Sequence, residues 1–196
     1  KFENPSVVIG HDCRFGGELF GETTAKVLAS KGVLVKLAKG FVSTPMVSLA
    51  VLKEKTNLGI VITASHNPPS YNGYKLKGDF GGPLLQADIT DVESRIPDTN
   101  SVDYTAISME GLVSEGKVVY VDLEDMYCKH AEDNFDLESI SKSDMNFAYD
   151  AMFGAGMNAV KRLLPNTTLL HCDDNPGFLG IAPEPIHRNL QEFSDL

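Results

Sequence analysis

Hydrophobic positions in the first part of the chain follow two alternating patterns. Short runs rich in Val, Ile and Leu at 7–9, 33–37 and 60–62 are typical of buried strands. Between them, apolar residues recur at helical spacing in 18–30 and in a segment that begins at Thr44-Pro45 and stops before residue 59. Helices that follow strands through short connections predict a parallel sheet built from right-handed crossovers.

The later part of the chain repeats this organisation less clearly. An Asn-Gly turn at 72–73 leads into an alternating strand that ends near residue 77, and a helix is predicted through the apolar face of 85–96. Residues 98–117 are polar and weakly periodic, as in a linker. Further elements are predicted at 123–130 (helix), 146–149 (strand), after 154–156 (helix), at 169–170 (strand) and across 186–193 (helix).

These elements predict an α/β fold with a mixed, mainly parallel sheet flanked by helices, followed by the start of a second, similar α/β domain. The predicted domains are residues 1–115 and 116–196. The composition agrees, because 196 residues with 42% hydrophobic and 22% charged side chains can fill a core. No apolar run approaches the ~18 residues of a membrane span. Three cysteines cannot all pair, which favours reduced thiols and a cytoplasmic protein.

Charge is distributed unevenly along the chain. Ten basic against five acidic residues give +5 in residues 1–77, and seven against twenty-two give −15 in the remainder. An acidic chain is a poor partner for nucleic acid or an anionic membrane. The basic first part could bind a small anion such as a phosphate, although lysines that merely solvate helices would produce the same balance.

Ligands of parallel sheets bind in the loops beyond the carboxyl ends of strands, here 10–14, 40–44 and 63–69. In the last of these, Ser65 precedes His66 and two prolines that stiffen the turn. A serine is a weak nucleophile that needs a base or prior activation. His66 and Lys75, which returns after the Asn-Gly turn, could supply positive charge to an anion on Ser65. The alternative is an ordinary Ser/Asn turn that caps a strand, with a solvated His66.

The run from Thr63 to Lys75, TASHNPPSYNGYK, closely resembles the phosphoserine loop of the α-D-phosphohexomutases, the phosphoglucomutase/phosphomannomutase family. Four other segments agree with this resemblance, which therefore extends over nearly the whole chain. They are a Gly-x-Asp-x-Arg loop at 10–14, a Thr-Pro helix start at 44–45, an Asp-x-x-x-Gly-x-Gly segment at 150–156, and Pro-Glu-Pro at 183–185, where members often carry Asn-Pro-Glu.

The resemblance implies a role for each matching residue. Ser65 would be the phosphorylated serine, with one phosphate oxygen on Mg²⁺, and His66 would contact the phosphoryl group. Lys75 would act as general acid/base toward the substrate hydroxyl, and Arg14 would lie near the phosphoserine. The implied reaction interconverts hexose 1-phosphate and hexose 6-phosphate of glucose or mannose through a bisphosphate, with hexose 1,6-bisphosphate as activator. Such transfer depends on positioning and cationic charge, and Mg²⁺ prefers the oxygen ligands that phosphate and carboxylates provide.

Several of the family's motifs do not occur in this sequence. These are the opening Gly-Thr-x-Gly-type motif, the Asp-Gly-Asp-x-Asp-Arg metal loop, the sugar-selecting loop and the phosphate-binding loop of the last domain. We therefore expect a fragment that is inactive alone and is completed by the remaining domains of the same polypeptide. Two alternatives stay open: a non-catalytic binding or regulatory module in which Ser65 is phosphorylated, and a related mutase for amino sugars or pentoses. Metal-ligand residue types at 128–130 and 171–174 lack the pairing of a zinc site and are interpreted as structural.

Overall fold

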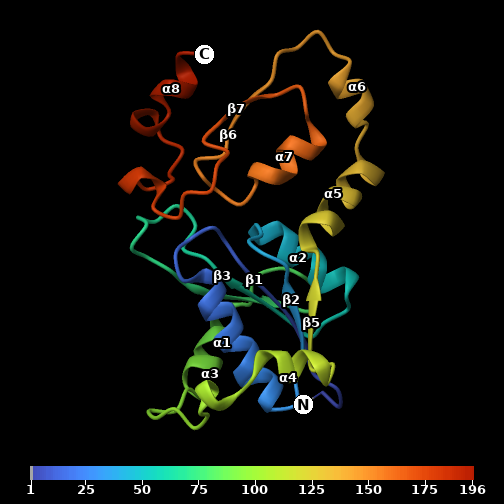
Figure 1. Ribbon diagram of the computed structural model, residues 1–196, viewed down its shortest axis with the longest axis vertical. Helices are drawn as coiled ribbons and strands as arrows, with labels where there is room; N and C mark the ends of the chain where they lie inside the picture. The colour runs from blue at the N-terminus through green and yellow to red at the C-terminus, as the bar shows by residue number, and fades with distance from the viewer. Residues whose placement is uncertain (1) are drawn as a thin grey trace.

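The computed structural model describes residues 2–196 and consists of two units stacked along the long axis of the molecule (Figure 1). We call residues 2–121 the first unit and residues 123–196 the second unit. The N-terminal end lies at the bottom of the first unit, and the C-terminus lies at the top of the second.

The first unit is built on a five-stranded sheet. Its strands are β1 (Ser6–His11), β2 (Leu34–Ala38), β3 (Leu58–Ile62), β4 (Tyr74–Gly78) and β5 (Val118–Val121), in the order β4-β3-β1-β2-β5. β4 is antiparallel to β3, and the other pairs are parallel. The predicted mixed, mainly parallel sheet is therefore confirmed.

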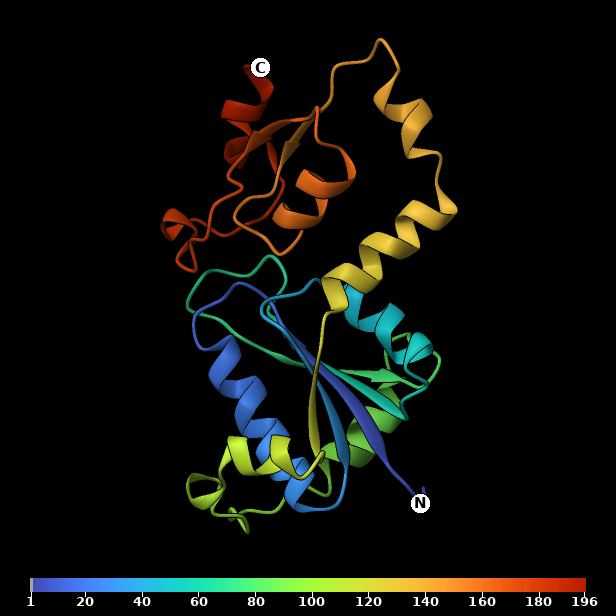
Figure 2. The same cartoon turned by 45° about the vertical axis from the view of Figure 1, so that its right-hand side comes forward.

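Helices cover both faces of this sheet. α1 (Gly17–Ser30) and α2 (Thr44–Lys53) lie on opposite sides of it (Figure 2). Alternate residues of the central strand β1 serve the two cores, as strand geometry requires: Val7 and Ile9 pack on the side of α1, whereas Val8 packs on the side of α2. All three are at most 1% exposed, which explains the uninterrupted hydrophobic run in the sequence.

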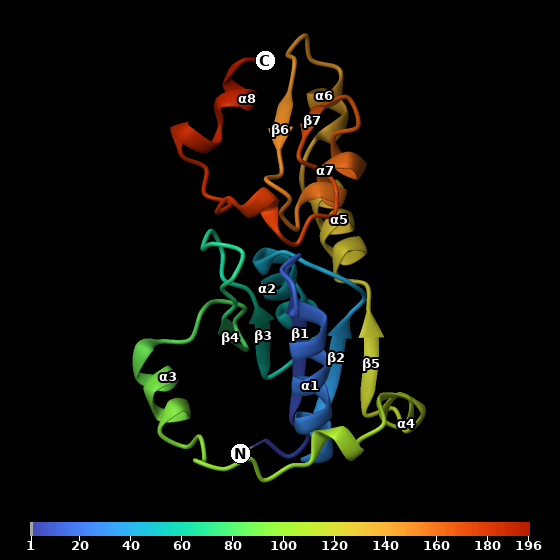
Figure 3. The ribbon, with the colours of Figure 1, turned by 60° about the vertical axis from the view of Figure 1, so that its left-hand side comes forward.

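The helix predicted at 85–96 forms only over α3 (Gln86–Glu93) and has no buried residue. Figure 3 shows α3 on the β4 side of the sheet, away from β5. Its apolar residues instead border a groove of about 830 Å³, together with residues of β3 and β4.

The linker predicted at 98–117 is wrong from residue 104 onward. It contains a 3-10 turn, Tyr104–Ala106, and α4 (Met109–Ser114), whose Met109 and Leu112 are buried in the core on the α1 side. β5 then pairs with β2, so the predicted boundary at 115/116 falls before a strand that belongs to the first sheet. This edge strand has only four residues and is half exposed, but it reads Val-Val-Tyr-Val, so its hydrophobic run was present in the sequence and was overlooked beside the polar segment before it.

The second unit contains α5 (Leu123–Asn134), α6 (Leu137–Ser141), β6 (Ala148–Asp150), α7 (Met157–Leu163) and β7 (Thr168–Leu170). β6 and β7 form a two-stranded parallel sheet. Two 3-10 turns, Phe178–Gly180 and His187–Asn189, precede α8 (Gln191–Ser194). The single amphipathic helix predicted across 186–193 is wrong, because its pattern is divided between the second turn and α8.

The two units share a core. Leu123 and Cys128 of α5 are buried in one cluster with Val47 and Val51 of α2, and Ala159 of α7 joins them. The three cysteines are free and buried. Within residues 2–196, no helix has the length and apolar character needed to cross a membrane.

Candidate active site

A cleft of about 500 Å³ lies where the two units meet. The first unit contributes all three loops that the sheet topology singled out, through Asp12 and Cys13, Ser43 and Thr44, and Thr63, Ser65 and His66. The second unit faces them with residues from the 150–156 segment and from the loop that follows β7. The carboxyl ends of the parallel strands therefore form one wall of this cleft, as expected for an α/β sheet.

Ser65 presents its hydroxyl at the surface of the cleft. The residue is exposed, and its Oγ lies 3.4 Å from His66 Nδ1. Its backbone has φ 56°, a left-handed conformation that is costly for a residue with a Cβ. The Ser65 amide donates to Thr63 Oγ1 at 3.0 Å, which helps to hold this conformation. The structure thus brings Ser65 and His66 together, as predicted.

Arg14 lies beneath the Ser65 loop, only 3% exposed. Its two terminal nitrogens donate to four backbone carbonyls of the loop: Nη2 to Ser65 (2.8 Å) and Asn67 (2.6 Å), and Nη1 to Pro68 (2.8 Å) and Tyr71 (3.1 Å). Burial lowers the pKa of Arg14, and the neighbouring Asp12 opposes that shift. Arg14 is near Ser65, as predicted, but its donors are used by the backbone, so in this arrangement it positions the loop.

Asp12 connects β1 to the same loop. One carboxylate oxygen accepts from the Arg14 amide at 3.0 Å, and the other accepts from Thr63 Oγ1 at 2.5 Å and lies 3.4 Å from Arg14 Nε. Sequence reasoning did not assign Asp12 or Thr63 a role. The signal was present in the Gly-x-Asp-x-Arg spacing, which puts a carboxylate and a guanidinium at the end of one strand.

Lys75 is not among the residues that border the cleft. It is exposed on β4, in register with Val61, and borders the groove beside α3. Lys75 therefore lies outside the wall of the cleft in this arrangement, whereas His66 Nδ1 lies 3.4 Å from the Ser65 hydroxyl.

The carboxylates that border the cleft are already engaged. Asp12 is bonded as described, and Asp150 accepts from the Met152 amide at 2.8 Å and lies 2.9 Å from His171 Nδ1. Within residues 2–196, no group of three His, Cys, Asp or Glu side chains is arranged to hold a metal ion. The side chains described here therefore do not fit a Mg²⁺ site by themselves.

Cys13 also borders the cleft, but its surroundings suppress its reactivity. Burial, together with the negative charges of Asp12 and Asp174, raises its pKa to about 12. Because the thiolate is the nucleophilic form, Cys13 is a structural residue of the cleft wall.

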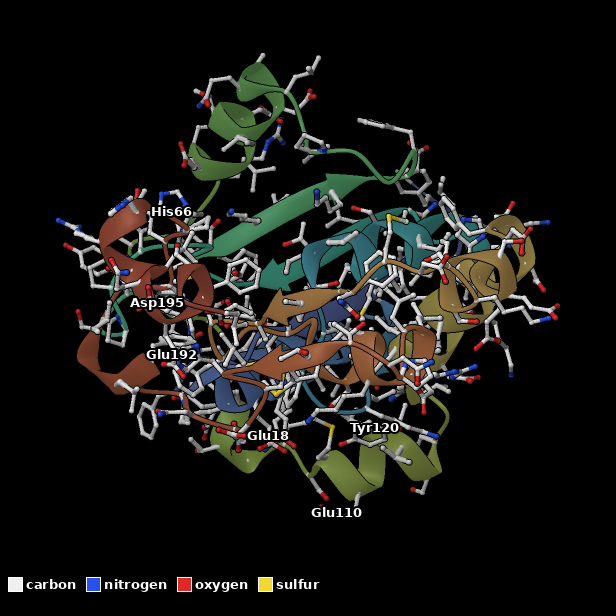
Figure 4. The ribbon with its side chains drawn as sticks, turned by 90° about the horizontal axis from the view of Figure 1, so that it is seen from above. Glu18, His66, Glu110, Tyr120, Glu192 and Asp195 are labelled. Atoms are coloured by element: carbon white, nitrogen blue, oxygen red, sulfur yellow. The ribbon has the colours of Figure 1, made fainter. Side chains whose placement is uncertain are left out.

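Acidic side chains gather on two different sides of the molecule. Viewed from above, His66 lies on the same side as Glu192 of α8 and Asp195, which directly follows this helix (Figure 4). Glu18, Glu110 and Tyr120 lie on another side, with α1, α4 and β5. Burial and the acidic residues of α1 and α4 raise the pKa of Tyr120 on that side.

Comparison with known proteins decides the family. Residues 1–103 match the family model described as phosphoglucomutase/phosphomannomutase, alpha/beta/alpha domain I, and residues 125–196 match that of domain II. The chain belongs to the phosphoglucomutase/phosphomannomutase family. This match confirms the family resemblance that the 63–75 loop carries. The two domain models cover the chain except for residues 104–124, which contain α4, β5 and the start of α5.

Members of the phosphoglucomutase/phosphomannomutase family match nearly all of this chain. A phosphoglucomutase of Staphylococcus haemolyticus is 31% identical over 92% of this chain and 34% of its own length. A Methanosphaera stadtmanae protein named "Probable phosphoglucosamine mutase" is 32% identical over 97% of this chain and 41% of its own length. The crystal structure of a phosphoglucomutase/phosphomannomutase family protein from Burkholderia thailandensis has a TM-score of 0.74 and 25% identity, over 97% of this chain and 41% of that one. The chain thus spans about two-fifths or less of these relatives.

Proposed function

We propose that the full-length protein is a phosphohexomutase that interconverts hexose 1-phosphate and hexose 6-phosphate of glucose or mannose. Ser65 would carry the phosphoryl group between the two positions of the sugar. The observation that carries this proposal is the exposed Ser65 hydroxyl, held on a stiff, left-handed turn at the wall of the cleft. A group that transfers phosphate needs this combination of access and fixed position.

The reaction has two transfers. A phosphoryl group passes from Ser65 Oγ, which takes up a proton, to a free hydroxyl of the sugar monophosphate, whose proton leaves to a base. The bisphosphate then turns around, and its other phosphoryl group returns to Ser65 Oγ, which gives up its proton, while the sugar oxygen takes up a proton. His66, 3.4 Å from Oγ, is suited to donate a hydrogen bond to the phosphoryl oxygens. Lys75 remains our proposed general acid/base, by resemblance alone.

Mg²⁺ would neutralise phosphate charge in such a reaction, and a phosphate oxygen on Ser65 would be one of its ligands. Since the side chains of residues 2–196 supply no further set of metal ligands, we propose that other domains of the same polypeptide supply them.

The proposal is tested by intact mass and peptide mapping of the full-length protein after incubation with glucose 1,6-bisphosphate. We expect a gain of ~80 Da on the peptide that holds Ser65. Ser65→Ala should abolish both the gain and the turnover, whereas Ser70→Ala, in the same exposed loop, is the matched control and should retain both. A Ser65→Ala protein with undiminished turnover would refute the assignment.

A phosphoglucosamine mutase is the second candidate, favoured by the name of the Methanosphaera relative. Turnover of glucose, mannose and glucosamine phosphates by the full-length protein distinguishes these substrates. A non-catalytic module that other enzymes phosphorylate on Ser65 would neither gain the mass from glucose 1,6-bisphosphate nor turn over any of these substrates.

A further inference from the structure

The second unit contributes an aromatic ring to the Ser65 loop. The guanidinium carbon of Arg14 lies over the ring of Phe178, 5.1 Å from its centroid. Both side chains are buried, Arg14 at 3% and Phe178 at 5% exposure. We propose that Phe178 is a positioning residue that locks the Ser65 loop by covering Arg14. This inference rests on the proposed function only in assigning the phosphoryl group to Ser65.

Arg14 needs such a cover because its bonds to the loop depend on the exclusion of water. Its terminal nitrogens hold four carbonyls of the loop, and its Nε makes no hydrogen bond. Hydrogen bonds of a charged donor are strong in a dry site, and water that reaches the guanidinium competes for each of them. The face of an aromatic ring excludes water and also attracts the cation.

The backbone around Phe178 is arranged to aim this ring. Phe178 and Leu179 have φ values of 48° and 53°, two successive left-handed residues that both carry a Cβ. This turn directs Phe178 into the protein and leaves Leu179 67% exposed. A strained backbone conformation persists where the surrounding structure imposes it. Here it places the ring of Phe178, in the second unit, against the guanidinium of Arg14, in the first.

The loop is therefore held from both units. Arg14 binds its carbonyls from the first unit, and Phe178 shields Arg14 from the second. The order of the Ser65 loop should then depend on how firmly the second unit is docked. Because phosphoryl transfer requires a fixed donor oxygen, loss of the ring should lower kcat while sugar-phosphate KM changes little.

The test compares Phe178→Ala, Phe178→Leu and Phe178→Tyr in the full-length protein. Leu179→Ala is the matched control, since it truncates the exposed neighbour in the same turn. Hydrogen exchange reports on three loop amides, those of Ser65, Asn67 and Tyr71, which donate to Thr63 Oγ1 and to the carbonyls of residues 64 and 68.

We expect the exchange of these amides to be ~5–30-fold faster in Phe178→Ala and Phe178→Leu, the equivalent of a cation–π contact of ~1–2 kcal/mol. Phe178→Tyr, which keeps the ring face, and Leu179→Ala should exchange as the wild type does. kcat should fall in the first two variants and recover in Phe178→Tyr.

Wild-type exchange in Phe178→Ala, or equal exchange in Phe178→Leu and Phe178→Tyr, would overturn the proposal. If Phe178→Ala fails to fold, the comparison of Leu with Tyr decides. The exchange readout does not require Ser65 to be phosphorylated. A failure of the mutase assignment would leave the exchange differences intact, whereas a failure of this inference would leave Ser65 phosphorylation intact.

Discussion

Arg14 should be the most sensitive single position of the Ser65 loop. Replacement by Met removes the donors for four carbonyls and leaves Asp12 without its cationic partner. A hydrogen bond to a charged group contributes ~1.5–3 kcal/mol, and loss of one partner of a buried ion pair costs ~3–5 kcal/mol. These terms are not additive, because the loop relaxes and water reaches the freed carbonyls. We therefore expect Arg14→Met to cost ~3–5 kcal/mol of unfolding free energy.

Arg14→Lys separates charge from geometry. An ammonium keeps the positive charge beside Asp12 but cannot reproduce the two-armed planar fork, so it reaches only part of the set of carbonyls. We expect a loss of ~2–3 kcal/mol, between the wild type and Arg14→Met.

Urea denaturation followed by far-UV circular dichroism measures these losses, since the chain has no Trp for fluorescence. Arg95→Met is the control, because Arg95 is exposed and pairs only with Asp91 one helical turn away. Its midpoint should equal that of the wild type. The reasoning is refuted if Arg14→Met unfolds at the same urea concentration as this control.

Three further predictions concern neighbouring positions. Gly10→Ala should cost ~1–3 kcal/mol in the same denaturation assay, because a Cβ would lie 2.5 Å from Val42 Cγ2; an unchanged midpoint would contradict the close packing. Cys13 should resist alkylation at pH 8 until the protein is unfolded, and ready labelling of the native state would contradict its burial. Since folding raises its pKa from 9.0 to about 12, the stability it contributes is complete below pH 9 and is lost as the pH rises toward 12. Lys75→Met in the full-length protein should lower kcat ~10²–10⁴-fold without reducing phosphoserine on Ser65; an unchanged kcat would remove its proposed role.

Much of the first sheet could be predicted because its central strands are buried on both faces. The runs at 7–9 and 60–62 are hydrophobic without interruption, the run at 33–37 is interrupted only by Lys36, and all three correspond to observed strands. The edge strand 118–121 is also a hydrophobic run, Val-Val-Tyr-Val, and it was missed because it is short and directly follows the polar segment interpreted as a linker. The prediction of one helix across 186–193 failed for a different reason. An apolar pattern at helical spacing does not by itself keep the helical hydrogen bonds continuous, and this segment is divided at Leu190.

The part of the site that depends on residues adjacent in the sequence could be predicted. Ser65 and His66 are adjacent, so their proximity follows from the turn itself. The hydrogen bonds from Arg14 to the Ser65 loop could not be predicted. Arg14 reaches carbonyls more than 50 positions away, and a sequence does not indicate which backbone carbonyls accept a hydrogen bond. Phe178 was missed because a lone aromatic in a Gly/Pro-rich loop has no pattern, and the position of Lys75 depends on the direction in which a strand side chain projects.

Transfer of phosphate from Ser65 to the sugar tests the central claim most directly. Full-length protein phosphorylated on Ser65 would be mixed with unlabelled hexose 6-phosphate in a rapid-quench instrument, and the phosphate on Ser65 and in the sugar would be followed through the first turnover. We predict that phosphate leaves Ser65 as fast as hexose bisphosphate appears, in equal amounts. Phosphate that stays on Ser65 while hexose 1-phosphate accumulates would contradict the claim.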